Sequence, residues 1–258
     1  MCAKAVPFED HFSGHAGEYA RYRPGYPGKL FSFLASLCRD HGLAWDCATG
    51  NGQAARKLAT HFRMVIATDA SEGQLAHAFR HPGVCYMVAS AEAPPLAPAT
   101  ADLITVAQAA HWLDLDQFYA QARKVLKPGG IIALWAYGLF HISAEIDALL
   151  HEYYHHTVGP FWPPQRKWID EKYQTLPFPF GEIPAPSFPM VARWDLSRVL
   201  GYIGTWSATR RYLKHYGRNP LEQIRQKLET LWGEPARLRT VQWPIYLRVG
   251  KHTSSPDM

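Results

Sequence analysis

Residues 45–53 read Trp-Asp-Cys-Ala-Thr-Gly-Asn-Gly-Gln, and this stretch decides the fold of the chain. It joins an apolar run at 43–47 to the segment 53–62, whose apolar residues recur at the spacing of one helical face. Gly50 and Gly52 let the backbone approach a bound ligand where a Cβ atom would collide. A strand, a glycine-bearing turn and a helix in this order predict a ligand site at the carboxyl edge of a parallel sheet.

A carboxylate stands at the end of the next apolar run, 64–68. Asp69 follows the glycine turn by about 20 residues, the separation at which an acidic side chain accepts hydrogen bonds from ribose hydroxyls in nucleotide-binding folds. The turn and this carboxylate together predict a nucleoside site.

The chain up to residue 136 alternates short apolar runs with helical stretches, which is typical of a parallel sheet flanked by helices. The run 241–249 suits a last strand that closes the sheet edge. We therefore expect an α/β fold with a Rossmann-like, mostly parallel sheet, an antiparallel last strand and a helical cap insertion. The other expected strands are 43–47, 64–68, 84–88, 103–107 and 131–136.

The composition changes after Tyr137, where Trp, Tyr, Pro and His become frequent. This change indicates an inserted cap, and we expect it to form a mobile cover with Gly201 and Gly204 as its flexible points. The parts of the single expected domain are an N-terminal cover at 1–30, a cofactor-binding core at 31–136, a cap and substrate region at 137–218, and a C-terminal helix and last strand at 219–250.

The bulk properties limit the class of protein. A chain of 258 residues with 47% hydrophobic content can bury a full core. Its longest apolar runs are far shorter than the roughly 20 residues of a membrane-spanning helix, and no signal-peptide pattern opens the chain. The net charge is +5, but the basic residues are scattered, so we expect no nucleic-acid partner. A cytoplasmic protein of open oligomeric state follows from these expectations.

Cysteines and histidines give no metal site in this interpretation. The residues 151–155 read His-Glu-Tyr-Tyr-His, which formally matches a zinc-protease helix, but Val158 and Phe161 stand where the longer signature needs Gly and His. We therefore expect no metal. Four cysteines lack metal-ligand spacing and are expected to be reduced: Cys2, Cys38, Cys47 and Cys85.

The glycine turn alone does not identify the nucleoside. Gly50-x-Gly52-x-x-Ala55 also satisfies a looser dinucleotide fingerprint, so an NAD-dependent oxidoreductase is one alternative and a non-catalytic nucleoside-binding protein is another. Asp46 favours S-adenosylmethionine, because a carboxylate suits the amino group of a methionine moiety and gains nothing beside a pyrophosphate. The chain also lacks an evident Tyr-x-x-x-Lys set for hydride transfer.

Several motifs together resemble the class I S-adenosylmethionine-dependent methyltransferases, particularly the type 11 and trans-aconitate-methyltransferase-like group. The resemblance covers most of the chain. The motifs that carry it are Tyr19…Arg23-Pro24-x-Tyr26-Pro27, Asp46 to Gln53, Thr68-Asp69-Ala70, Ser90-Ala91-Glu92, Gln108…His111-Trp112 and Val125-Leu126-Lys127-Pro128-Gly129-Gly130.

The resemblance implies S-adenosyl-L-methionine as cofactor, S-adenosyl-L-homocysteine as product and a small-molecule methyl acceptor. The methionine end would lie on the glycine turn, the ribose on Asp69, and the sulfonium beside Gln108. Ala48 stands where the family usually has Gly, which implies an altered turn or weaker cofactor binding. The cofactor-binding residues implied are Asp46, Ala48, Gly50, Gly52, Asp69, Ala70, Ala91, Glu92 and Gln108, with Tyr19 and Arg23 as a cover.

Methyl transfer from a sulfonium is an in-line displacement, in which alignment alone can supply roughly 7–11 kcal/mol of the barrier. A base is therefore optional. His111 is the candidate general base, because its unperturbed pKa of about 6.5 lies near working pH, and the alternative is a histidine that only lines the pocket. The acceptor would offer a carboxylate or a hydroxyl. The residues expected around it are Trp112, Tyr137, Trp206 and Arg210.

Overall fold

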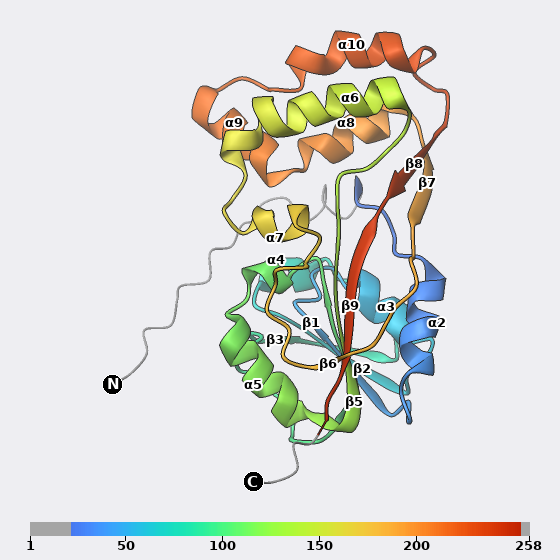
Figure 1. Ribbon diagram of the computed structural model, residues 1–258, viewed down its shortest axis with the longest axis vertical. Helices are drawn as coiled ribbons and strands as arrows, with labels where there is room; N and C mark the ends of the chain where they lie inside the picture. Colours follow the sequence, from blue (N-terminus) through green and yellow to red (C-terminus); the bar gives the residue numbers. More distant parts are fainter. Residues whose placement is uncertain (1–21, 254–258) are drawn as a thin grey trace.

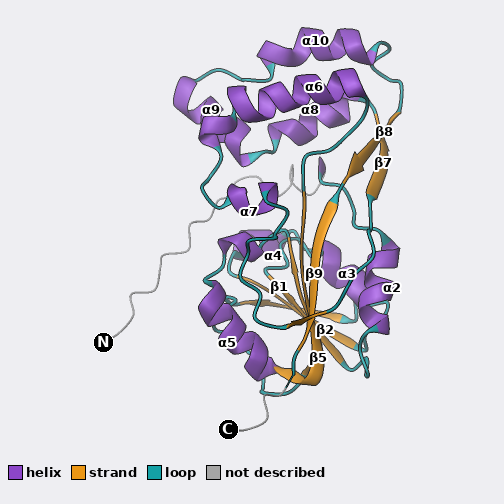
Figure 2. Cartoon of the chain, viewed as in Figure 1, coloured by secondary structure: helices purple, strands orange, loops and turns teal. Residues whose placement is uncertain are grey.

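A computed structural model describes residues 22–253, which form two regions stacked along the long axis of the molecule (Figure 1). The lower region is a twisted sheet with helices on both faces, and the upper region is a layer of helices. Figure 2 makes the division visible, because strands fill the middle of the lower region and helices make up most of the upper one. The chain passes between the two regions more than once, so segments that are distant in sequence meet at their boundary.

The main sheet has seven strands in the order β3-β2-β1-β4-β5-β9-β6. Strands β1 to β5 pair in parallel, and β9 runs antiparallel to both of its neighbours. This order confirms the expected Rossmann-like, mostly parallel sheet with an antiparallel last strand. The strand bounds are β1 Leu43–Cys47, β2 Met64–Asp69, β3 Val84–Val88, β4 Ala101–Ala107, β5 Leu126–Tyr137, β6 Gly181–Glu182 and β9 Ile245–Lys251.

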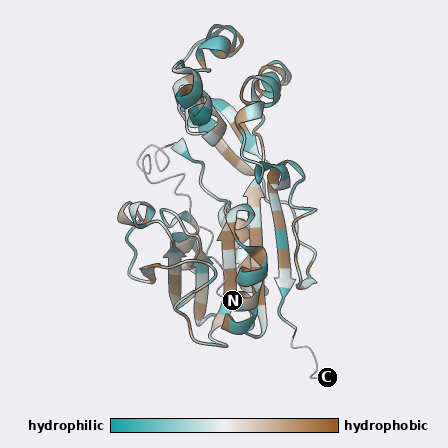
Figure 3. Ribbon diagram, turned by 90° about the vertical axis from the view of Figure 1, so that its left-hand side faces the viewer, coloured by the Kyte–Doolittle hydropathy of each residue, from teal (hydrophilic) through white to brown (hydrophobic). Residues whose placement is uncertain are grey.

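Four helices flank the strands: α2 Gly28–Ser36, α3 Gln53–Leu58, α4 Glu72–Ala76 and α5 Leu115–Val125. Successive strand residues point to opposite faces. Ala44 and Leu103 pack with α2 and α3 on one face, while Trp45 and Ile104 pack with Phe118 of α5 on the other. Both faces are thus buried, and Figure 3 shows the hydrophobic residues concentrated in the central strands.

The helix expected at 53–62 is shorter in the structure. It ends at Leu58, and turns follow to Phe62. Leu58 and Phe62 nevertheless enter the same hydrophobic core. The helical spacing therefore identified the buried residues correctly but set the end of the helix four residues too late.

The single strand expected at 241–249 is wrong. The structure has two strands, β8 (Arg239–Trp243) and β9, with Pro244 between them. β8 pairs with β7 (Met190–Trp194) in a separate two-stranded sheet beside the cap. Proline has no backbone N–H to donate to a ladder, so the chain changes partners at this residue.

The upper region has its own hydrophobic core, and its C-terminal helix packs with the cap helices. Ile224 and Leu228 of that helix lie in one cluster with Ile146 and Leu150. Among residues 22–253, no helix is both long enough and apolar enough to cross a bilayer. The elements after β5 are α6 Ala144–Glu152, a π-helical turn η3 Tyr153–Thr157, η4 Gly159–Phe161, α7 Arg166–Asp170, α8 Leu196–Gly204, α9 Ser207–Tyr216 and α10 Glu222–Trp232.

Part of the expected cap range leaves the cap. Residues 171–180 descend along the sheet, where Pro177 accepts a hydrogen bond from the Tyr119 hydroxyl at 2.6 Å and Phe180 packs edge-on against the Tyr119 ring. The short strand β6 then pairs with β9. This strap ties the cap to the lower region.

The two glycines expected as flexible points lie inside α8. A Cβ atom at Gly201 would overlap the ring of Tyr22, so this glycine allows the leader to pack closely against the helix. Gly204 is the last residue of the same helix. The hinge interpretation of these two positions is therefore wrong.

Candidate active site

The glycine turn adopts left-handed backbone conformations at three positions. The φ angles are +52° at Ala48, +57° at Gly50 and +81° at Gly52. A Cβ atom at Gly52 would also overlap the hydroxyl of Tyr86 on β3. Glycine is therefore required at 52 by both conformation and space, whereas Ala48 holds its conformation against a strain of about 1–2 kcal/mol.

Asp46 lies beneath the turn and is fully buried. Its carboxylate accepts hydrogen bonds from the hydroxyls of Thr105 at 2.7 Å and Thr49 at 2.5 Å. Burial raises the pKa of Asp46 to about 6, and these two bonds and the Ala55 N–H oppose that rise. The contacts of Asp46 support a role in holding the turn, and its expected contact with a methionine amino group stays a prediction.

Asp69 ends β2 and links the turn to the next loop. One carboxylate oxygen accepts from the Gly50 N–H and the other from the Ser71 N–H, each at 2.8 Å. A carboxylate at this strand end is a suitable acceptor for ribose hydroxyls. The geometry therefore fits the expected ribose contact.

Two buried polar groups beside the turn are left without a partner. Within residues 22–253, neither Asn51 Nδ2 nor Gln74 Oε1 takes part in a hydrogen bond, although both side chains are about 5% exposed or less. An unpaired buried amide costs about 1–3 kcal/mol. The pair of orphaned groups, next to a glycine cradle, fits a site that a polar ligand completes.

The other residues expected near the nucleoside surround the same sheet edge. Ala91 is buried, and Glu92 accepts from the Asp114 N–H at 3.2 Å. Ala70 follows Asp69 directly. Tyr19 lies outside the described residues.

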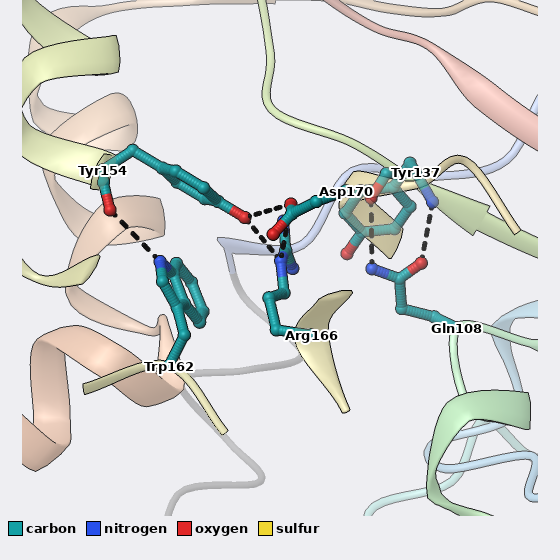
Figure 4. A network of polar contacts seen from close by, with 6 residues as sticks. All are labelled: Gln108, Tyr137, Tyr154, Trp162, Arg166 and Asp170. Carbon is teal, nitrogen blue, oxygen red and sulfur yellow. Dashed lines mark hydrogen bonds and ion pairs between the residues drawn. The ribbon is translucent and has the colours of Figure 1, made fainter. Parts of the chain in front are cut away.

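Gln108 joins the carboxyl ends of two strands. Its Oε1 accepts from the Tyr137 N–H at 2.8 Å, its Nε2 donates to the Tyr137 carbonyl at 3.4 Å, and its own N–H donates to the Trp135 carbonyl at 2.7 Å (Figure 4). The amide is thus used to fix the end of β4 against β5.

A cavity of about 60 Å³ lies at the boundary of the two regions. It brings together most of the residues that the sequence placed at the acceptor, from the leader, both strand ends and the cap. The residues that line it are Arg23, Gln108, His111, Trp112, Tyr137, Gly138, Leu139, Trp162, Pro163, Arg166, Ile169, Tyr202, Trp206 and Ser207.

Arg210 is not among the residues lining this cavity, contrary to expectation. It lies on α9, and its Nε donates to the Gly204 carbonyl at the end of α8 at 3.4 Å. Arg23 and Arg166 supply the positive charge of the cavity in its place. Arg23 had been expected over the cofactor, and nothing in the motif order indicated Arg166.

His111 is 4% exposed, and its Nδ1 lies 2.8 Å from the hydroxyl of Tyr173. Burial, together with the positive charge of Arg166, lowers the pKa of His111 to about 3. The histidine is therefore neutral at neutral pH and a weak proton acceptor. The argument from an ordinary histidine pKa was wrong for this residue.

Two arginines line the cavity, Arg23 from the leader and Arg166 from α7. Arg23 donates from Nη1 to the Tyr137 hydroxyl at 2.8 Å and lies 5.3 Å from the centroid of the Tyr202 ring. Arg166 lies 4.6 Å from the centroid of a Trp162 ring. Such a pair of guanidinium groups on an aromatic surface suits an anion.

The histidines of the zinc-like motif, His151 and His155, are exposed on the cap. The rings of His151 and His155 are 4.1 Å apart on α6 and η3. In the part of the chain that the structure describes, no three His, Cys, Asp or Glu side chains gather as metal ligands. Cys38, Cys47 and Cys85 are free thiols.

Known proteins resemble the chain over nearly its whole length. A family model described as a methyltransferase domain matches residues 45–134. A protein of Dictyostelium discoideum described as a methyltransferase is 33% identical over 95% of each chain. A solved structure of a type II methyltransferase from Anaeromyxobacter dehalogenans is 42% identical, covers 91% of this chain and all of that one, and has a TM-score of 0.85. The fold is also that of a phosphoethanolamine N-methyltransferase of Haemonchus contortus in complex with S-adenosyl-L-methionine, at 16% identity, TM-score 0.51 and coverage of 97% and 61%.

Proposed function

The chain belongs to the class I S-adenosylmethionine-dependent methyltransferases, and from this premise we propose that it methylates a carboxylate of a small-molecule acceptor. The family sets aside both alternatives considered from the sequence, an NAD-dependent oxidoreductase and a non-catalytic nucleoside-binding protein. The nature of the acceptor is the part that rests on the cavity.

The cofactor, when bound, supplies an electrophilic methyl group on a sulfonium. Asp69 would hold the ribose through its carboxylate at the end of β2, and the left-handed turn from Ala48 to Gly52 would receive the methionine end. Asn51 and Gln74 would complete their hydrogen bonding on the same ligand. Ala70, Ala91 and Glu92 lie along the edge where the adenine is expected.

The presence of Arg23 and Arg166 in one cavity with a non-basic His111 carries the proposal. A carboxylate is already ionised at neutral pH, so no base has to remove a proton from it. Its negative charge is attracted by the two arginines. A hydroxyl acceptor would have to lose a proton, and a histidine with a pKa of about 3 is poorly matched to that task. A protonated amine would be repelled by both arginines. The carboxylate is therefore preferred over the hydroxyl.

The remaining cavity residues position the acceptor and limit its size. Trp112, Trp162 and Trp206 present flat aromatic walls, and Gln108 fixes the strand ends below them. Alignment of nucleophile and methyl carbon can then supply most of the roughly 7–11 kcal/mol that proximity offers. A small cavity between two regions favours a small molecule over a nucleic-acid base or a protein side chain.

The proposal is tested by product analysis. The protein is incubated with S-adenosyl-L-methionine and a set of small carboxylic acids, each paired with its alcohol and its amine. We expect S-adenosyl-L-homocysteine and methyl esters from acids alone. Methyl ethers or methylamines as the main products would contradict the carboxylate assignment.

A further inference from the structure

Arg166 reaches the cavity with its terminal nitrogens unused. Its side chain is 15% exposed, and Nε is its only atom that donates a hydrogen bond to any of residues 22–253. The two Nη atoms therefore have no acceptor in the described part of the chain. A guanidinium in this state offers two parallel N–H groups to a carboxylate.

Three side chains hold the guanidinium in place (Figure 4). Arg166 Nε donates to the Tyr154 hydroxyl at 2.6 Å, and that hydroxyl donates to Asp170 Oδ1 at 2.7 Å. Asp170 Oδ1 is also 3.5 Å from Arg166 Nε. The Trp162 ring lies against the guanidinium plane. All of these contacts use Nε or the face of the group and leave its forked end open.

The π-helical turn brings Tyr154 to this position. In η3 two consecutive tyrosines are buried, with the Tyr153 hydroxyl 3.2 Å from the Thr209 hydroxyl and the Tyr154 hydroxyl on Arg166. The Tyr154 carbonyl accepts from Trp162 Nε1 at 3.3 Å. π-Helical turns are rare in proteins, and those that occur often lie at functional sites. Here the turn places Tyr154 in contact with both Arg166 and Trp162, which line the cavity.

The charge of Arg166 is poorly neutralised on the cavity side. Its partner Asp170 is 45% exposed and therefore screened by solvent, whereas Arg166 is largely buried. The same positive charge helps to lower the pKa of His111 and opposes the rise in the pKa of Tyr137. An anion within the cavity would complete the arrangement.

We propose that Arg166 binds the anionic group of the acceptor through its two terminal nitrogens, and that Tyr154 is a positioning residue that fixes the guanidinium plane. The inference rests on the proposed function, because it assigns the acceptor's anion to one residue of that cavity. It predicts that removing the Tyr154 hydroxyl weakens acceptor binding although that hydroxyl does not touch the acceptor.

The probe pair is benzoate and benzamide, which share a flat ring and differ in charge. Binding of each to the full-length protein saturated with S-adenosyl-L-homocysteine is measured by calorimetry. We expect benzoate to bind the wild type at least about tenfold more tightly than benzamide, since a charge-assisted pair is worth that factor or more. Arg166→Gln should weaken benzoate by about tenfold to hundredfold and leave benzamide within about twofold.

Tyr154→Phe and Tyr153→Phe form a matched pair, because both tyrosines are buried in the same turn and both hydroxyls are hydrogen-bonded to side chains, Tyr154 to Arg166 and Asp170 and Tyr153 to Thr209 alone. Tyr154→Phe should weaken benzoate by about threefold to tenfold, and Tyr153→Phe should not change it. This contrast still tests the inference if Arg166→Gln fails to fold. A general loss of cap stability would instead affect both variants and both probes.

Three results would overturn the inference: equal binding of benzoate and benzamide by the wild type, unchanged benzoate binding in Arg166→Gln, or equal effects of the two tyrosine variants. The inference and the proposed function can fail separately. If benzoate binds through Arg166 but no carboxylic acid is methylated, the proposed reaction fails alone. If methyl esters form and Arg166→Gln leaves the acceptor KM unchanged, the inference fails alone.

Discussion

The cofactor turn and the acceptor cavity are built in different ways. The turn is held mainly by contacts between residues close in sequence, such as Asp46 with Thr49 and Gly50 with Asp69, which are 3 and 19 residues apart. One longer contact, between Asp46 and Thr105, spans 59 residues. The cavity is held by contacts such as Arg23 with Tyr137 and His111 with Tyr173, whose partners are 114 and 62 residues apart. A site made by local contacts leaves a motif in the sequence, and a site made by the packing of two regions does not.

The largest effect on this comparison is expected from Gly52→Ala. The new Cβ would overlap the Tyr86 hydroxyl, and the residue would have to keep a φ of +81°. Strain and overpacking together should lower the free energy of unfolding by about 2–4 kcal/mol and abolish tight cofactor binding. Urea unfolding and calorimetry with S-adenosyl-L-homocysteine measure both.

Gly50→Ala is the matched control for this prediction. Gly50 shares the positive φ, but the nearest atom to its added Cβ would be 3.7 Å away, so only the conformational strain applies. Equal losses in the two variants would show that the contact with Tyr86 contributes nothing.

Asp69→Ala should affect the turn region alone. Loss of the ribose hydrogen bonds should weaken S-adenosyl-L-homocysteine by about tenfold to a hundredfold, which corresponds to about 1.5–3 kcal/mol. The partners of this carboxylate that the structure describes, Gly50 and Ser71, do not line the acceptor cavity, so the preference for benzoate over benzamide should persist once the protein is saturated with S-adenosyl-L-homocysteine. Unchanged affinity in a folded variant would remove Asp69 from the cofactor site.

The pH dependence of stability should have opposite signs for His111, which lines the cavity, and for Asp46, which lies beneath the turn. The folded pKa of His111 is about 3, below its ordinary value of 6.5, so below pH 6.5 the unfolded chain takes up a proton that the folded chain does not. Its contribution is complete above pH 6.5 and is lost as the pH falls. Asp46 has a raised pKa of about 6, so its contribution is complete below about pH 4 and is lost as the pH rises through 6.

The variant His111→Asn removes the pH-dependent contribution of His111 to stability and leaves that of Asp46. It should reduce the stability gained between pH 4 and pH 7 by about 3 kcal/mol, measured by urea unfolding at each pH. A variant that keeps the full wild-type slope would place the responsible group elsewhere.

The smallest effect is expected from Ala48→Gly. Glycine adopts the φ of +52° without strain, but it gains conformational freedom in the unfolded chain, so the variant should be more stable by at most about 1 kcal/mol. Thermal unfolding measures the change, and Ala48→Val, with a β-branched side chain in the same conformation, should be destabilising. A more stable valine variant would show that the turn is not strained at this position.

The sequence alone was sufficient to predict the parallel sheet and to locate the glycine turn. Gly50, Gly52 and Asp69 could be located because a tight turn between a strand and a helix restricts the residue type, and the spacing to the next strand end is regular. The contact of Asp69 with a ribose stays a prediction. The split of the last strand was missed, although Pro244 was a visible signal, because the apolar run around it continues on both sides.

The cavity was predicted only in part, because its members meet through the packing of the cap. Trp112, Tyr137 and Trp206 were placed correctly at the boundary, but Arg210 was chosen where Arg166 lies. Both arginines stand in the same aromatic stretch, and only the π-helical turn at Tyr153–Thr157 and the position of α7 decide which one faces inward. The i, i+4 spacing of Arg166 and Asp170 was the one local signal.

The most direct test of the two-site account is to measure both ligands in two variants. Calorimetry with S-adenosyl-L-homocysteine, and then with benzoate and benzamide at saturating S-adenosyl-L-homocysteine, is applied to Asp69→Ala and Arg166→Gln. We predict that Asp69→Ala loses affinity for S-adenosyl-L-homocysteine and keeps its preference for benzoate over benzamide. Arg166→Gln should keep its affinity for S-adenosyl-L-homocysteine and lose the preference for benzoate. Loss of both properties in each variant would contradict the account, because the turn and the cavity would then be one cooperative site.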